Sequence, residues 1–80
     1  QVVPQDQVLK AAKDLARKLA SKSAVAVTQS LRAIDAGAEL PLADGLAKEA
    51  EAFGAVAASE DSKEGVRAFL EKRQPQFKDR

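Results

Sequence analysis

Apolar side chains recur along this chain of 80 residues at the three- and four-residue intervals of an amphipathic helix. Polar or helix-breaking stretches interrupt the pattern at Ser21–Ser23, Gly37–Pro41 and Ser59–Asp61. The only candidate strand is the pair Val2–Val3 near the start. The pattern therefore predicts an all-α fold of about four helices, with residues 1–80 forming a single helical domain.

Residues suited to helix starts stand where the apolar stripes begin. The carboxyl of Asp6 and the hydroxyl of Ser23 are placed to accept hydrogen bonds from the free amides of the first and second helices. Pro41 suits the first turn of the third helix. Asp61 and Glu64 have the spacing of a capping box, which predicts the start of a fourth helix.

Glycine and proline mark the expected helix ends and close contacts. We expect Gly37 to close the second helix in the left-handed conformation and Pro75 to end the fourth. Gly45 and Gly54 lie inside the third helix, where each costs about 1 kcal/mol relative to alanine, so a neighbouring element is expected to pass close. Gly65 indicates either a passing backbone or ligand, or simple helix packing, and its position leaves both open.

The apolar residues are too small to build a substantial core. They make up 45% of the chain, but alanine supplies much of that fraction, and the only aromatic residues are Phe53, Phe69 and Phe77. Alanine favours helix strongly but buries little surface. We therefore expect a thin core, and apolar faces at Ala24–Val27 and around Phe53 that need a partner.

Composition excludes several classes of function. Lys and Arg number 13 against 12 Asp and Glu, a net charge of +1 that argues against a dedicated nucleic-acid surface. No apolar run approaches the roughly 20 residues that span a bilayer, so no membrane partner is expected. The chain has neither cysteine nor histidine, which removes disulfides, thiolate metal sites and a Ser-His-Asp triad. We expect no metal site.

The carboxylates give no independent sign of acid–base catalysis. The candidate pairs are Glu49 with Glu51 and Glu60 with Asp61, and Glu64 lies nearby. Each sits beside lysine in a helical pattern or at a helix start, whereas catalytic carboxylates need desolvation to shift their pKa. We interpret them as solvated charges or caps and assign no catalytic residue to this chain.

The second half of the chain carries the most specific signal, as an ordered series of short segments. The series consists of Pro41–Phe53, Ser59–Asp61, Glu64–Gly65, Ala68–Arg73 and Phe77–Lys78. This series resembles the C-terminal helical segment of the enoyl-CoA hydratase/isomerase (crotonase) superfamily. The similarity extends over nearly the whole chain, and its most specific parts are the segments between Ser59 and Arg73.

The resemblance implies a parent enzyme built from repeated ββα units, whose oxyanion-hole amides and catalytic carboxylates lie upstream of this segment. The complete parent would hydrate a trans-2-enoyl-CoA to a 3-hydroxyacyl-CoA, with coenzyme A as part of the substrate and no separate cofactor. The chain alone is then expected to be inactive. The resemblance also implies that Phe53 and Phe69 line the acyl or pantetheine channel, and that Lys72 approaches the phosphate-bearing adenosine end of coenzyme A.

The resemblance further implies a homo-oligomer, a trimer or a dimer of trimers for the parent, in the cytoplasm or, in a eukaryote, the mitochondrial matrix. The loop expected at Ala58–Lys63 would lie near the acyl tail. Two alternatives remain open. One is a stand-alone, non-catalytic helical module that assembles into dimers or trimers, and the other is a small helical protein that binds acyl-CoA by itself.

Overall fold

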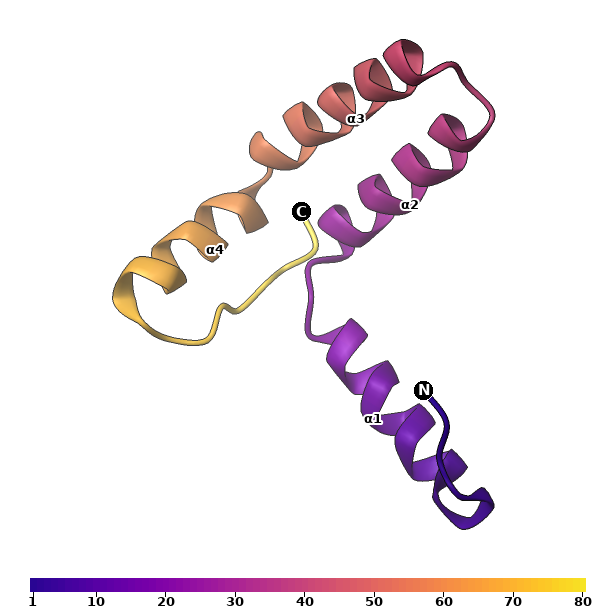
Figure 1. The fold of residues 1–80 in the computed structure, drawn as a ribbon. Helices are drawn as coiled ribbons and strands as arrows, with labels where there is room; N and C mark the ends of the chain where they lie inside the picture. Colours follow the sequence, from indigo (N-terminus) through magenta and orange to yellow (C-terminus); the bar gives the residue numbers. More distant parts are fainter.

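A computed structural model describes residues 1–80 and confirms an all-α chain with four α-helices and no strand. A short 3₁₀ turn, η1, precedes the first helix, and residues after the fourth helix form an extended tail (Figure 1). The elements are η1 (Gln5–Gln7), α1 (Val8–Ala20), α2 (Ala24–Ala38), α3 (Leu42–Ala57) and α4 (Glu60–Glu71).

Helices α2 and α3 lie side by side as a hairpin (Figure 1). They approach most closely at two glycines: a Cβ atom added to Gly45 would lie 3.6 Å from the Cα atom of Gly37. The close approach predicted at Gly45 is thus confirmed, whereas a Cβ atom on Gly54 would meet nothing within 4 Å. Gly37 is not left-handed, because α2 continues through it to Ala38, and no glycine has a positive φ.

The hydrophobic core is as thin as the composition predicts. Ala68 is the one hydrophobic residue that is buried. The apolar turn at Ala24–Val27 is half-buried apart from Ala24, which is exposed. The radius of gyration is 15.9 Å, against about 12 Å for a compact domain of this length. The accessible surface is 6719 Å², against about 4,700 Å² for a compact monomer of this mass. The helices therefore spread out around very little buried apolar volume.

Helix α1 projects away from the α2–α3 hairpin (Figure 1). Its apolar residues Val8, Leu15 and Leu19 are all more than half exposed. The expected cap at Asp6 is wrong, because Asp6 lies inside the 3₁₀ turn that Gln7 closes on the Pro4 carbonyl, and no side chain caps α1. The stripe on α1 is consequently a complete apolar face without a partner in this chain.

The start of α4 differs from the predicted capping box. Ser59 is the N-cap, and its hydroxyl oxygen accepts a hydrogen bond from the Ser62 amide at 3.1 Å. Asp61 and Glu64 are thereby left free to accept hydrogen bonds from other parts of the chain. The loop expected at Ala58–Lys63 is also shorter than predicted, because α4 begins at Glu60.

Helix α4 ends before Pro75, so the expectation that this proline stops it is wrong. Lys72 adopts the left-handed conformation with φ of 56°. Its amide donates to the Phe69 carbonyl at 3.2 Å, and the Arg73 amide donates to the Ala68 carbonyl at 3.0 Å. These two bonds form a Schellman motif, which satisfies the last carbonyls of α4 and turns the chain back along the helix.

Leucine substitution at two glycines of α3 tests the close approach. We expect Gly45→Leu to force α2 and α3 apart and to destabilise the hairpin by about 1–3 kcal/mol, as overpacking does. Gly54→Leu is the matched control, because the space around Gly54 is open, and it should stabilise α3 by up to about 1 kcal/mol. Thermal unfolding followed by circular dichroism measures both, and equal effects of the two substitutions would contradict this packing.

Candidate functional site

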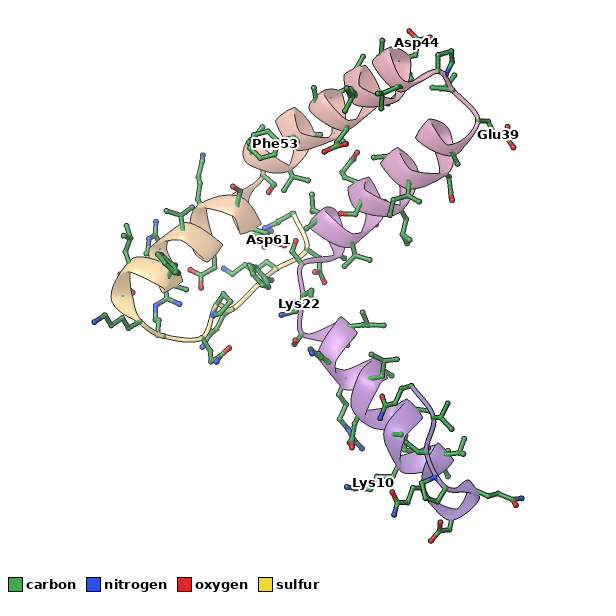
Figure 2. All side chains as sticks on the ribbon, in the orientation of Figure 1. Lys10, Lys22, Glu39, Asp44, Phe53 and Asp61 are labelled. Atoms are coloured by element: carbon green, nitrogen blue, oxygen red, sulfur yellow. The ribbon has the colours of Figure 1, made fainter.

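The most deeply buried charged side chain is that of Asp61, which is only 3% exposed. Its carboxylate accepts hydrogen bonds from the Ser23 hydroxyl at 2.5 Å, from the Lys78 amide at 2.8 Å and from the Asp79 amide at 2.9 Å. The Asp61 amide donates to the Arg80 carbonyl at 2.8 Å. Figure 2 shows Asp61 where the start of α2, helix α4 and the tail come together. One carboxylate therefore joins three segments that are far apart in sequence.

Asp79 completes this polar cluster from the tail. It adopts a left-handed conformation with φ of 62°, and its carboxylate accepts a hydrogen bond from the Ala24 amide at 2.8 Å. Ser23 does occupy the N-cap position of α2, but its side chain makes no cap bond, and its hydroxyl is turned toward Asp61, to which it donates. The carboxylate of Asp79 thus takes over the capping role predicted for the hydroxyl of Ser23.

A second set of bonds fastens the tail along α4. The Arg73 guanidinium donates to both carboxylate oxygens of Glu64, at 2.7 and 3.0 Å, and its Nε donates to Glu71 at 2.6 Å. The Gln76 amide donates to Glu64 at 2.8 Å. Such a two-pronged arginine–carboxylate pair fixes orientation as well as distance. The tail is consequently held to α4 at both of its ends, by Glu64 near Arg73 and by Asp61 near Lys78.

Gly65 lies beneath the tail. A Cβ atom added to it would lie 3.6 Å from the Phe77 ring, which is half-buried against this part of α4. The close neighbour predicted at Gly65 is therefore a side chain of the same chain, neither a ligand nor another helix. This contact anchors Phe77, and with it the tail, against α4.

The carboxylates of Asp61 and Glu64 are both stabilised in their charged form. Burial by itself raises the pKa of Asp61, but hydrogen bonds from Ser23, Lys78 and Asp79 outweigh it and hold that pKa below its usual range. The hydrogen bonds from Arg73 and from the Gln76 amide lower the pKa of Glu64 to about 2. The carboxylates keep their charge at neutral pH and act as acceptors for the tail.

The three residues that the resemblance implies for acyl-CoA binding are not enclosed by this chain. Phe53 lies on α3, where its ring, 74% exposed, borders a shallow groove with Ala26 and Val56. Phe69 lies on α4 and is 82% exposed, and Lys72 follows α4 as an exposed residue. Their roles remain predictions.

The hydroxyl groups of three serines near helix ends are engaged in structural bonds. Ser21 donates to the Lys18 carbonyl at 2.7 Å, and Ser59 donates to the Val56 carbonyl at 2.6 Å. Ser23 is bonded to Asp61. No group of three or more histidine, cysteine, aspartate or glutamate side chains is placed to hold a metal ion.

The chain matches the family model described as enoyl-CoA hydratase/isomerase over residues 1–80. It is 43% identical over 79 residues to the 2,3-dehydroadipyl-CoA hydratase of Escherichia coli (strain K12), covering 99% of this chain and 31% of that protein. It is 40% identical over 80 residues to the short-chain-enoyl-CoA hydratase of Clostridium acetobutylicum, again covering 99% of this chain and 31% of the relative.

A solved structure shares the backbone arrangement. The enoyl-CoA hydratase of Bacillus anthracis superposes with a TM-score of 0.94 at 37% identity, over 99% of this chain and 31% of that one. The chain thus belongs to the enoyl-CoA hydratase/isomerase family, and it corresponds to the C-terminal helical segment of a crotonase fold. It spans about a third of the length of the relatives it matches. None of its helices has the length and apolar character to cross a membrane.

Acid titration tests the bonds that hold the tail. Because folding lowers the pKa of Glu64 from 4.5 to about 2, its stabilisation of the docked tail is present above pH 4.5 and is lost as the pH falls through about 2. We expect carbon NMR of the Glu64 carboxyl to show a midpoint near pH 2, with the Gln76 amide signal changing in step.

The variant Arg73→Gln provides the comparison for this titration. Without the guanidinium, the Glu64 midpoint should move up toward 4.5, the ordinary value. A midpoint that is the same in both proteins would show that Arg73 does not stabilise the Glu64 carboxylate.

Proposed function

We propose that residues 1–80 form the C-terminal assembly segment and acyl-CoA-site cover of an enoyl-CoA hydratase/isomerase family enzyme. The complete enzyme adds water to a trans-2-enoyl-CoA and gives a 3-hydroxyacyl-CoA. The observation that carries this proposal is a family match over the whole chain together with a structure in which most large apolar side chains are exposed.

The exposed apolar surface supports the assembly role. Fourteen large hydrophobic side chains, distributed over all four helices and the connecting residues, are exposed. Apolar surface on this scale marks a site of contact with another protein surface. We assign the faces to the catalytic region of the parent and to neighbouring subunits, in a trimer or a dimer of trimers.

The covering role places Phe53 and Phe69 along the acyl or pantetheine channel and Lys72 at the phosphate-bearing end of coenzyme A. Two exposed aromatic rings offer the apolar wall that an acyl chain or a pantetheine arm needs. A lysine serves as a point charge for a phosphate group. The Schellman motif at the end of α4 sets the backbone position of Lys72.

This segment contributes binding and assembly, and the reacting groups come from the rest of the enzyme. The isolated chain is accordingly proposed to be inactive, with coenzyme A entering as part of the substrate and no cofactor held by residues 1–80. We place a bacterial parent in the cytoplasm and a eukaryotic one in the mitochondrial matrix. A relative from Dictyostelium discoideum, described as a probable mitochondrial enoyl-CoA hydratase, supports the second location.

The same exposed faces favour a second candidate, a stand-alone helical module that assembles with copies of itself without catalysis. Sedimentation equilibrium of the 80-residue chain separates the two. A folded dimer or trimer favours the module, and a poorly helical monomer favours a segment that needs the rest of the enzyme. Saturable binding of coenzyme A by the isolated chain would instead favour a small acyl-CoA-binding protein.

A hybrid enzyme tests the principal proposal. Residues 1–80 replace the matching segment of the Escherichia coli 2,3-dehydroadipyl-CoA hydratase. We expect the hybrid to form the parent's oligomer and to hydrate its substrate, followed by the ultraviolet absorbance of the enoyl thioester. The isolated chain and the remaining part of the enzyme should each be inactive. An inactive but correctly assembled hybrid would contradict the proposal.

Lys72→Gln in the hybrid tests the phosphate contact. Loss of one charge pair should raise KM for the enoyl-CoA on the order of tenfold with little change in kcat, because the phosphate takes no part in the reaction. The enoyl-pantetheine analogue, which lacks the phosphate, should show no such change. Lys10→Gln, on the projecting helix α1, is the control. An equal rise in KM for both substrates would show that Lys72 acts elsewhere.

A further inference from the structure

Helix α4 and the tail are tied to the rest of the chain by very few bonds. Between residues 1–57 and residues 60–80, the only two hydrogen bonds are Ser23 to Asp61 and Ala24 to Asp79, and no salt bridge crosses. The covalent link between α3 and α4 is the pair Ala58–Ser59. Because no hydrophobic core lies between α4 and the hairpin, the angle between them depends on this polar cluster.

That angle sets the spacing of the proposed acyl-CoA contacts. Phe53 lies on α3, whereas Phe69 lies on α4 and Lys72 at its end. A rotation of α4 about Ala58–Ser59 would carry Phe69 and Lys72 away from Phe53 without disturbing either helix internally. Small displacements of binding groups are costly, since a misplacement of about 1 Å can reduce a rate on the order of a hundredfold.

We propose that Asp61 is a positioning residue for the acyl-CoA site, and this inference rests on the function proposed above. Its carboxylate holds the Ser23 hydroxyl on one side and the tail amides of Lys78 and Asp79 on the other, and so fixes α4 at one angle to the α2–α3 hairpin. The aspartate touches no part of the substrate and acts through the positions of Phe69 and Lys72.

The hydrogen bonds of the polar cluster require a side chain with two acceptor oxygens at position 61. One oxygen, Oδ2, accepts from both the Ser23 hydroxyl and the Asp79 amide. In Asp61→Asn, either amide orientation replaces one acceptor with an NH₂ group, which faces at least one backbone N–H donor. A buried amide without a partner is destabilising, so the substitution should loosen the cluster while keeping the shape of the side chain.

Two substitutions at Asp79 separate the loss of its hydrogen bond to the Ala24 amide from a change in backbone conformation. Its left-handed φ of 62° is accessible to both glycine and asparagine. Asp79→Asn keeps an oxygen that accepts from the Ala24 amide, and Asp79→Gly keeps the backbone conformation but removes the acceptor. We expect Asp79→Gly to loosen α4 and Asp79→Asn to retain its orientation. Asp35→Asn, at an exposed position of α2, is the control for lost charge.

The orientation is measured by spin labels in the hybrid enzyme, with labelled subunits diluted in unlabelled ones. Residues 1–80 contain no cysteine, and any cysteine in the remaining part of the hybrid is replaced by serine. Labels at Lys48→Cys on α3 and Leu70→Cys on α4 should give one narrow distance distribution. Asp61→Asn and Asp79→Gly should broaden it, and Asp79→Asn and Asp35→Asn should not. A broad distribution in the unsubstituted hybrid, or a narrow one in Asp61→Asn, would overturn the inference.

Steady-state kinetics of the same variants in the hybrid hydratase test whether the orientation of α4 affects the proposed acyl-CoA site. Asp61→Asn should raise KM on the order of tenfold with kcat nearly unchanged and the oligomer intact, and Asp79→Gly should change KM in the same direction by less. If Lys72→Gln raises KM but Asp61→Asn does not, this inference fails while the proposed function stands. If Lys72→Gln has no effect, the proposed phosphate contact fails, and the spin-label distances still decide whether Asp61 orients α4.

Discussion

The hydrogen bonds of the Asp61 carboxylate determine the arrangement of the second half of the chain. In most domains of this size, packed apolar side chains fix the angles between helices, and polar groups add specificity. Here the buried residues are Ser23, Asp61 and Ala68, so the contact between α4 and the hairpin is mainly polar. A buried carboxylate is tolerated because its acceptor positions are filled by a hydroxyl and two backbone amides.

The remaining structure consists of helices that make most backbone hydrogen bonds internally but leave their apolar faces largely uncovered. Forty-two of the 53 backbone hydrogen bonds lie within helices, so most backbone groups are satisfied locally. Between α2 and α3, two glycines let the backbones approach in place of interlocking side chains. The apolar faces of α1, α3 and α4 stay open, which is how the surface of one part of a larger enzyme is expected to look.

The helices were predictable from sequence because their signals are local. The apolar stripes, Ser23 before α2 and Pro41 at the start of α3 set helix positions through neighbours within a few residues, and the observed helices begin beside these two residues. The polar cluster was not predictable in this way. Ser59 and Asp61 are both suitable caps for α4, and the choice is settled by tail amides 17 and 18 residues beyond Asp61. Gly37 was misassigned for the same reason, since its partner Gly45 lies on the next helix. The contacts of Phe53, Phe69 and Lys72 depend on surfaces outside residues 1–80 and remain predictions.

The bond between the Ala24 amide and Asp79 has a consequence for the time course of biosynthesis. Its two partners are 55 residues apart. The Asp61 carboxylate likewise cannot accept its two tail hydrogen bonds until Lys78 and Asp79 have been synthesised. During translation, α1, the α2–α3 hairpin and α4 have all been synthesised before either tail amide exists, and N-terminal parts of a chain generally fold first. A ribosome that stops short of Lys78 would release a chain with its helices formed and no fixed angle between α4 and the hairpin. Premature termination at this point would leave the angle between α4 and the hairpin undefined, while the helical content of the protein stayed almost unchanged.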